Sequence, residues 1–290
     1  MLQQIKNAAR KCARNPNRIW YYLRIAPSLL YRHYRTERGR RGWDLGSPSE
    51  GELSLHVILR TTDAVMNMNA SRALEEIGLV TKRDVIKTGG CSLFGAAKKF
   101  VEKFGRDRLR VTLVLDNMSE EGLSLYRESA SKTGVAFDVV QAKGHGNGPS
   151  FQTQIDVALA DDDATIELIL EDDYLMYEDA LVYPFEVMSG HSRVAGFTPH
   201  FHPDHVRLQD FGKIAVIQRH LCCRVPNTCC TFFARRGVMK RYESKLRLYD
   251  GWEIGTVNAI WAREICLAPL GWTLAEHLHR SDLSPVQTLV

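Results

Sequence analysis

Residues Ala164–Leu181 read ATIELILEDDYLMYEDAL, and they pose the question on which the fold depends. An apolar, strand-like run meets three successive acids, Glu171, Asp172 and Asp173. Three adjacent carboxylates repel one another, and burying them unpaired is costly. A divalent cation at the end of a buried strand would neutralise them, whereas a strand that simply ends in solvent would leave them hydrated.

The elements around this stretch alternate between strand-like and helix-like patterns. Strands are predicted over 53–63, 110–117 and 135–142, and helices over 92–105, 119–134 and 146–160. Such alternation predicts an α/β domain over 53–290, with a mainly parallel central sheet and helices on both faces. Ligands of such sheets bind at the carboxyl ends of the strands. We therefore expect Asp63, Asp116 and the acidic triplet to converge on one crevice.

A crevice with these groups suits a nucleotide diphosphate held together with a hard cation. Mg2+ or Mn2+ takes oxygen ligands from one or two carboxylates and from phosphates. Alternate residues of an extended segment face the same way, so Glu171 and Asp173 are both expected to face the crevice. The cation would offset the charge that develops on a leaving diphosphate.

This order of motifs resembles the GT-A glycosyltransferases, whose DxD motif ends the fourth strand. The acidic triplet, the Asp116–Asn117 pair and the NGPSF start of a helix at Asn147 carry the resemblance, which covers roughly residues 53–279. Glu171 at the first motif position departs from the family pattern. The resemblance implies a hexosyl- or pentosyltransferase that uses Mn2+ or Mg2+. It would move a sugar from a nucleotide-sugar donor to a glycan or lipid-linked acceptor, as in polysaccharide biosynthesis.

The resemblance also implies roles for individual residues. The donor-binding residues would be Thr61, Asp63, Asp116, Asn147, Gly148, Glu171 and Asp172. The metal ligands would be Asp173 and Glu171, joined by His277 or His279 from the C-terminal segment. Asp116 is equally typical of a strand-to-helix turn, which would give it no role in donor binding. For either histidine, the alternative to a metal ligand is an ordinary surface residue.

Inverting members of the family place an acid on a helix in the last part of the chain, where it acts as general base. Asp250 and Glu253, on a helix expected over Tyr249–Ile265, are the candidates. Asp250 as an N-cap is the alternative. An inverting transfer is expected, and a retaining mechanism stays open.

The first 45 residues differ in composition from the rest. Residues 1–42 hold eleven basic residues and one acid, interleaved with apolar and aromatic side chains. This predicts a basic amphipathic segment that contacts an anionic membrane surface; a solvated tail is the alternative, and nucleic acid is a less favoured partner. No apolar run is long enough to span a bilayer. The seven cysteines are an odd number in a long chain, which indicates reduced thiols rather than a disulfide framework. A cytoplasmic protein, peripheral on the membrane, is expected.

One motif favours a different enzyme. FTPHFHPDHV contains His200, His202, Asp204 and His205, in the H-x-H-x-D-H spacing of zinc metallo-hydrolases. In those proteins the loop comes early and needs more chain behind it than follows here. Nucleotidyltransferases would carry a glycine-rich loop after the first strand, which this chain lacks, and a non-catalytic binding protein also stays open.

Overall fold

The computed structural model describes residues 44–49, 51–63, 81–161, 165–200, 214–228, 230–250, 256–270 and 272–278. The chain divides into two compact units, Met1–Asp44 and Leu45–Val290. The predicted basic segment, up to residue 43, lies outside the described residues, as do Glu253 and His279. No helix of the described part has the length and apolar character needed to cross a bilayer.

The second unit is built on a sheet that has nine strands among the described residues. In spatial order these are β3 (Asp138–Gln141), β2 (Leu109–Leu115), β1 (Ser54–Thr61), β4 (Thr165–Glu171), β9 (Phe232–Arg235), β6 (Val194–Phe197), β10 (Ile265–Pro269), β8 (His220–Arg224) and β7 (Ile214–Ile217). The run β3–β2–β1–β4 is parallel, and β9 joins β4 antiparallel. The parallel half confirms the predicted sheet and brings four carboxyl ends to one edge.

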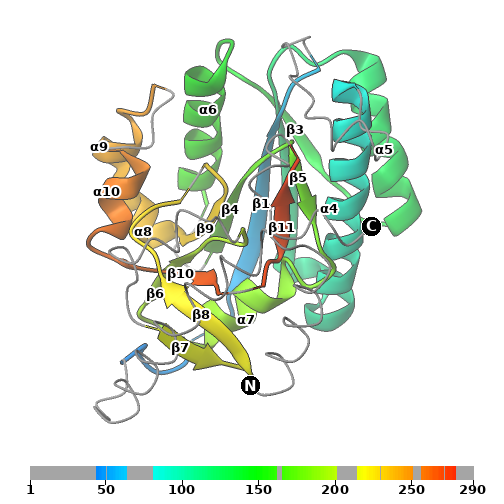
Figure 1. The fold of residues 1–290 in the computed structure, drawn as a ribbon. Coiled ribbons are helices and arrows are strands. Elements are labelled where there is room, and N and C mark those ends of the chain that lie inside the picture. The colour runs from blue at the N-terminus through cyan, green and yellow to red at the C-terminus, as the bar shows by residue number, and fades with distance from the viewer. Residues whose placement is uncertain are drawn as a thin grey trace, which may run out of the picture. The chain divides into compact units, whose positions relative to one another are not determined.

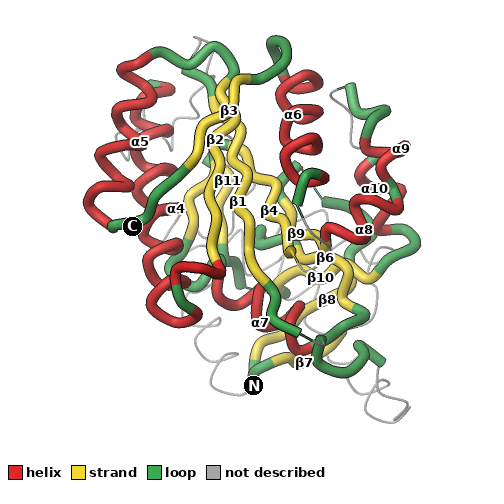
Figure 2. Tube along the Cα trace, turned by 180° about the vertical axis from the view of Figure 1, so that it is seen from behind, coloured by secondary structure: helices red, strands yellow, loops and turns green. Residues whose placement is uncertain are grey.

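Helices cover both faces of this parallel half, as predicted (Figures 1 and 2). Helix α6 (Asn147–Leu159) lies on one side, and α4 (Lys82–Phe104) and α5 (Glu120–Thr133) lie on the other. The remaining helices are the 3-10 turn η1 (Arg106–Arg108), α7 (Val182–Gly190), α8 (Arg236–Arg241), α9 (Glu243–Leu246) and α10 (Val257–Trp261).

A second, two-stranded sheet joins distant parts of the chain. Strand β5 (Tyr174–Met176) pairs antiparallel with β11 (Ala275–His277), and His277 lies opposite Tyr174. Because β5 begins directly after Asp173, the C-terminal part of the chain is brought to the end of β4 (Figure 1).

The predicted start of helix 92–105 is wrong, because α4 begins ten residues earlier, at Lys82. Thr81 caps it in a reciprocal capping box with Asp84. The pair Gly89–Gly90 suggests a break, since glycine weakens a helix interior. Instead both glycines permit close packing: a Cβ at Gly89 would lie 3.0 Å from the carbonyl oxygen of Asp172, and one at Gly90 would lie 3.1 Å from the Tyr126 ring.

The predicted helix over Tyr249–Ile265 is also wrong at both ends. Tyr249 and Asp250 are not helical, and the helix that the structure describes here is the short α10, whose N-cap is Thr256. Asp250 is therefore not its cap. Ile265 begins β10, which is inserted between β6 and β8, so pairing within the central sheet overrides the helical pattern.

Candidate functional site

The acidic triplet lies at the carboxyl edge of the parallel strands. Glu171 is the last residue of β4, and Asp172 and Asp173 form the turn into β5. The preceding residues of β4 are buried, whereas Glu171 is only partly so. The strand is thus a core strand that meets three carboxylates at its end, as the sequence implied.

Each carboxylate of the triplet has a basic partner of its own, and each partner comes from a different element. Arg60 of β1 pairs with Glu171. Lys82, the first residue of α4, reaches Asp172 with Nζ 2.5 Å from Oδ1. Nε2 of His277 in β11 lies 3.1 Å from Oδ2 of Asp173. The repulsion that the sequence raises is therefore offset pairwise, within the protein itself.

The pair between Arg60 and Glu171 follows from strand register. The two residues are neighbours across β1 and β4, and Arg60 is only 6% exposed. Its second terminal nitrogen, Nη1, donates to the carbonyl oxygen of Asn147 at 2.8 Å. Burial alone would lower the pKa of Arg60, but the carboxylate of Glu171 raises it, so the guanidinium stays charged. Burial raises the pKa of Glu171, and Arg60 opposes that shift.

Asp172 uses both carboxylate oxygens inside the protein. Oδ2 accepts hydrogen bonds from Thr61 Oγ1 at 2.9 Å and from the backbone N–H of Thr62 at 3.0 Å, while Oδ1 accepts from Lys82. Thr61 Oγ1 also lies 2.9 Å from the Tyr126 hydroxyl. Asp172 thereby ties the end of β1 to the start of α4.

Asp173 has one carboxylate oxygen that is not used within the protein. Its Oδ1 is buried and accepts no hydrogen bond from any residue that the structure describes. Burial by itself would raise the pKa of Asp173, but His277, followed by Lys82 and Arg60, lowers it to about 2. An ionised carboxylate and a neighbouring imidazole can both ligate a divalent cation such as Mn2+. The residues present therefore fit a metal ion.

The β5–β11 pairing holds His277 in this position. The backbone N–H of Leu278, the next residue, donates to the carbonyl oxygen of Asp173 at 2.7 Å. The ring of Tyr174 packs edge-on against His277, with centroids 4.9 Å apart. The histidine is thus oriented by neighbours on both strands.

The other predicted donor residues lie at the same edge and make turn contacts. Asp63 accepts from the backbone N–H of Ser119, the N-cap of α5, at 2.9 Å. Asp116 accepts from the backbone N–H of Gly146, the N-cap of α6, at 2.7 Å, and lies 3.0 Å from His145 Nδ1. These contacts fix the starts of both helices.

The start of α6 connects the triplet to Asp250. Asn147 is held by Arg60, which also holds Glu171. At the next residue, a Cβ on Gly148 would lie 3.6 Å from Cα of Asp250. The structure therefore brings the α6 start beside both Glu171 and the exposed Asp250.

Of the proposed zinc cluster, only His200 is among the described residues; His202, Asp204 and His205 lie outside them. His200 Nδ1 lies 3.1 Å from the carbonyl oxygen of Ala275 in β11. Neither this contact nor the fold supports the zinc hydrolase.

Sequence reasoning missed Arg60 and Lys82 as members of the site. Arg60 had a signal, because a charged residue inside an apolar strand needs a partner when it is buried. Lys82 had none, because it lies at the start of a helix that was expected to begin later.

A second buried polar cluster lies toward the other end of the strands. His56 Nδ1 is 2.6 Å from Asp161 Oδ2 and 3.3 Å from Glu167 Oε2, and Arg110 pairs with Asp161. Glu167 is fully buried, and apart from this contact with His56 its oxygens have no partner within hydrogen-bond geometry among the described residues. Arg110 supplies the positive charge at this cluster.

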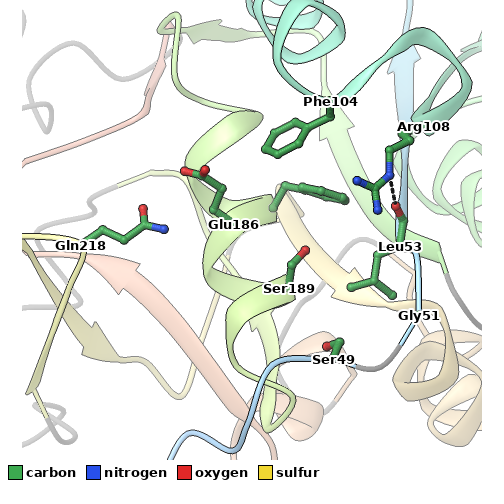
Figure 3. A pocket seen from close by; sticks show the side chains of 9 residues that line it. Ser49, Gly51, Leu53, Phe104, Arg108, Glu186, Ser189 and Gln218 are labelled. Carbon is green, nitrogen blue, oxygen red and sulfur yellow. Dashed lines mark hydrogen bonds between the residues drawn. The ribbon is translucent and has the colours of Figure 1, made fainter.

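A cavity of about 280 Å³ lies beside the amino-terminal ends of β1 and β2 (Figure 3). It is lined in part by Phe104, Phe185 and Arg108, whose Nε donates to the carbonyl oxygen of Leu53 at 3.0 Å. This end of the strands is opposite to the triplet, so the cavity is separate from the site described above.

Neither a protein-family model nor a curated protein sequence matches the chain. Solved structures do. A fragment of S. aureus TarS, residues 1–349, matches with a TM-score of 0.50 and 13% identity over 79% of this chain and 62% of that one. The same fragment has a structure in complex with UDP-GlcNAc, at a TM-score of 0.47, 12% identity and coverage of 78% and 60%.

A mannosyltransferase from Pyrobaculum calidifontis, in complex with GDP-Man and Mn2+, matches with a TM-score of 0.44 and 16% identity, over 76% of this chain and 55% of that one. This chain covers less than two thirds of the length of each of these proteins. The arrangement of the sheet and helices, together with the TarS match, confirms the predicted GT-A-like fold.

Proposed function

We propose that this chain, with its GT-A fold, is a metal-dependent glycosyltransferase that moves a sugar from a nucleotide-sugar donor to an acceptor. The observation that carries the proposal is Asp173, an ionised carboxylate with a buried, unpartnered oxygen, beside His277. Both lie at the strand edge where ligands of such sheets bind. The unpartnered oxygen of Asp173 is available to a cation at that edge.

In this proposal Asp173 and His277 hold Mn2+ or Mg2+, and His279 is the second candidate histidine. When bound, the cation stabilises negative charge on the departing diphosphate. Arg60 and Lys82 offset the charges of Glu171 and Asp172, which lowers the repulsion that an anionic ligand would otherwise meet at the triplet.

The donor lies along the ends of β1, β2 and α6 in this proposal. Thr61, Asp63 and Asp116 lie beside the nucleotide. Asn147 and Gly148 approach the donor from the start of α6. The hydrogen bonds that Asp63 and Asp116 accept from the backbone N–H groups of Ser119 and Gly146 support the proposal, because side chains that are already fixed lose little freedom when a ligand binds. The type of sugar and base is left open.

Asp250 is the first candidate for general base, and Glu253 is the second. Asp250 is exposed, and its backbone lies against Gly148 at the start of α6. A carboxylate there would take the proton of the acceptor hydroxyl while the sugar is displaced with inversion. The acceptor is a glycan or a lipid-linked glycan, and residues 1–42 bring the enzyme to an anionic membrane.

The test is a donor panel. Purified protein with Mn2+ is incubated with UDP- and GDP-sugars, and release of the nucleotide diphosphate is followed with and without a pool of glycan acceptors. We expect release from one donor class, abolished by EDTA and in Asp173→Asn. Absence of release from every donor, from protein that is folded, would contradict the proposal.

The base is tested on the donor found in that panel. Loss of a general base lowers the rate by about 10²–10⁴-fold and leaves donor binding largely unchanged. We expect this of Asp250→Asn. If Asp250→Asn retains activity and Glu253→Gln loses it, the base is Glu253; if both retain activity, the enzyme is not inverting through either residue.

A further inference from the structure

We propose that His56, Asp161 and Glu167 form a zinc site, which fastens the carboxyl end of α6 to the central sheet. The site is structural and separate from the catalytic cation. Glu167 and Glu171 are both in β4, four residues apart, which is about 13 Å along a strand. One ion cannot bridge that distance, so the inference does not rest on the proposed function.

The strand register brings the residues of this site together. His56 of β1 is the direct neighbour of Glu167 in β4 and of Arg110 in β2. The three side chains therefore lie in a row on one face of the sheet. Asp161 joins this row from the chain just beyond α6, and its carboxylate reaches His56.

The spacing of the three ligand atoms suits a metal ion. One atom from each side chain lies within 4.8 Å of the others. Nδ1 of His56 is 3.3 Å from Glu167 Oε2 and 2.6 Å from Asp161 Oδ2. Imidazole and carboxylate ligands of a tetrahedral zinc ion lie about 3.3 Å apart. The spacing to Glu167 already fits, and the spacing to Asp161 has to lengthen.

The buried carboxylate of Glu167 points to a ligand at this place. Its side chain is fully buried, and Oε1 has no hydrogen-bond partner among the residues that the structure describes. Oε2 has only the contact with His56. A buried carboxylate is costly unless it is paired or coordinates a metal.

The hydrogen bonds of His56 leave Nδ1 ready to coordinate. Arginine can only donate hydrogen bonds, and Arg110 Nη2 lies 2.8 Å from Nδ1, which is therefore the acceptor. The ring proton is then on Nε2, which lies 2.8 Å from Thr112 Oγ1. A histidine that binds a metal usually donates its second ring N–H in this way. The lone pair of Nδ1 faces the Asp161 oxygen, and a cation between them would relieve their repulsion.

Arg110 holds the place that a cation would take. It pairs with Asp161 and contacts His56, and its side chain is 49% exposed, so it can turn into solvent when the ion enters. Zn2+ would then match the charges of the two carboxylates. The exposed arginine also marks the way in, because His56 and Glu167 are buried.

The experiment titrates Zn2+ into the full chain after EDTA has been used to strip it of metal. Melting temperature and zinc bound at equilibrium dialysis are both measured. Zinc at a hundredfold excess over its dissociation constant should raise the melting temperature of the wild type by about 5–10 °C. Glu167→Gln should bind zinc at least about tenfold more weakly. The same variant should melt higher than the wild type in EDTA, since it buries no charge, so misfolding cannot explain the lost binding.

Two further variants locate the ion. Asp173→Asn, which alters the carboxyl edge of the sheet, should bind zinc at this site as the wild type does. Arg110→Gln removes the competing positive charge and should bind zinc about tenfold more tightly. Combining it with Glu167→Gln should abolish that gain.

Three results would overturn the inference. One is a wild type whose melting temperature does not respond to zinc. Another is equal zinc binding by the wild type and Glu167→Gln, which would place the ion elsewhere, at the acidic triplet if Asp173→Asn loses it. The third is zinc affinity in folded Arg110→Gln that is no higher than in the wild type.

Discussion

Replacing Gly89 by alanine tests how α4 positions the turn that carries Asp172 and Asp173. A Cβ at Gly89 would lie 3.0 Å from the carbonyl oxygen of Asp172 and 3.1 Å from that of Tyr174, so both oxygens must move by a few tenths of an ångström. Asp172 is held by Thr61 and Lys82 and has little room to move. Overpacking of this kind costs about 1–3 kcal/mol, against a gain of about 1 kcal/mol from helix propensity.

Gly95, on the same helix, is the matched control. It is exposed, and a Cβ there would have no neighbour within 4 Å, so Gly95→Ala should stabilise the protein by about 1 kcal/mol. Gly89→Ala should instead be neutral or lose up to about 2 kcal/mol. A difference of 1 kcal/mol shifts the melting temperature by about 2–4 °C in a domain of this size.

Thermal and denaturant unfolding of the two variants would measure the difference, and binding of Mn2+ with UDP or GDP would report on the turn itself. Binding should weaken in Gly89→Ala and stay unchanged in Gly95→Ala. Equal stabilisation by both substitutions, with equal binding, would refute the reasoning that α4 approaches the turn too closely for a side chain.

Three further predictions concern other parts of the chain. Burial raises the pKa of Glu167, so its carboxylate destabilises the fold above that raised pKa; Glu167→Gln should melt higher than the wild type at pH 7, and the difference should shrink as the pH falls toward 4. Burial also raises the pKa of Cys222 to about 11 and of Cys223 to about 12. Iodoacetamide at pH 8 should therefore label the exposed Cys91 long before either of them. Mass spectrometry of the peptides would measure the order of labelling. Residues 1–42 should bind anionic vesicles in a salt-sensitive manner, and equal sedimentation with vesicles after their deletion would contradict the membrane proposal.

The parallel half of the sheet could be predicted because its signals are local. Each of its strands carries a short apolar or β-branched run, and the helices between them carry their own end signals. Ser119 caps α5, and Gly134 ends it in the left-handed conformation with φ of 71°. The acidic triplet at the end of β4 follows from the same pattern, so its place in the fold could also be predicted.

The partners of the triplet could not be predicted, since they depend on register and on distant pairing. Arg60 meets Glu171 only because β1 and β4 align in that register. His277 reaches Asp173 through β5 and β11, two strands of three residues each. Strands so short have no periodicity to detect. The sequence suggested His277 through its family resemblance, and the structure brings it beside Asp173.

The central claim is that Asp173 forms a cation-dependent site for a nucleotide diphosphate, and isothermal titration tests it most directly. UDP and GDP are titrated into the wild type and into Asp173→Asn, each with Mn2+ and with EDTA, after unfolding curves have shown that both proteins are folded. We predict binding of one nucleotide to the wild type with Mn2+, and none with EDTA or in the variant. Equal binding to both proteins, or equal binding with and without Mn2+, would contradict the account.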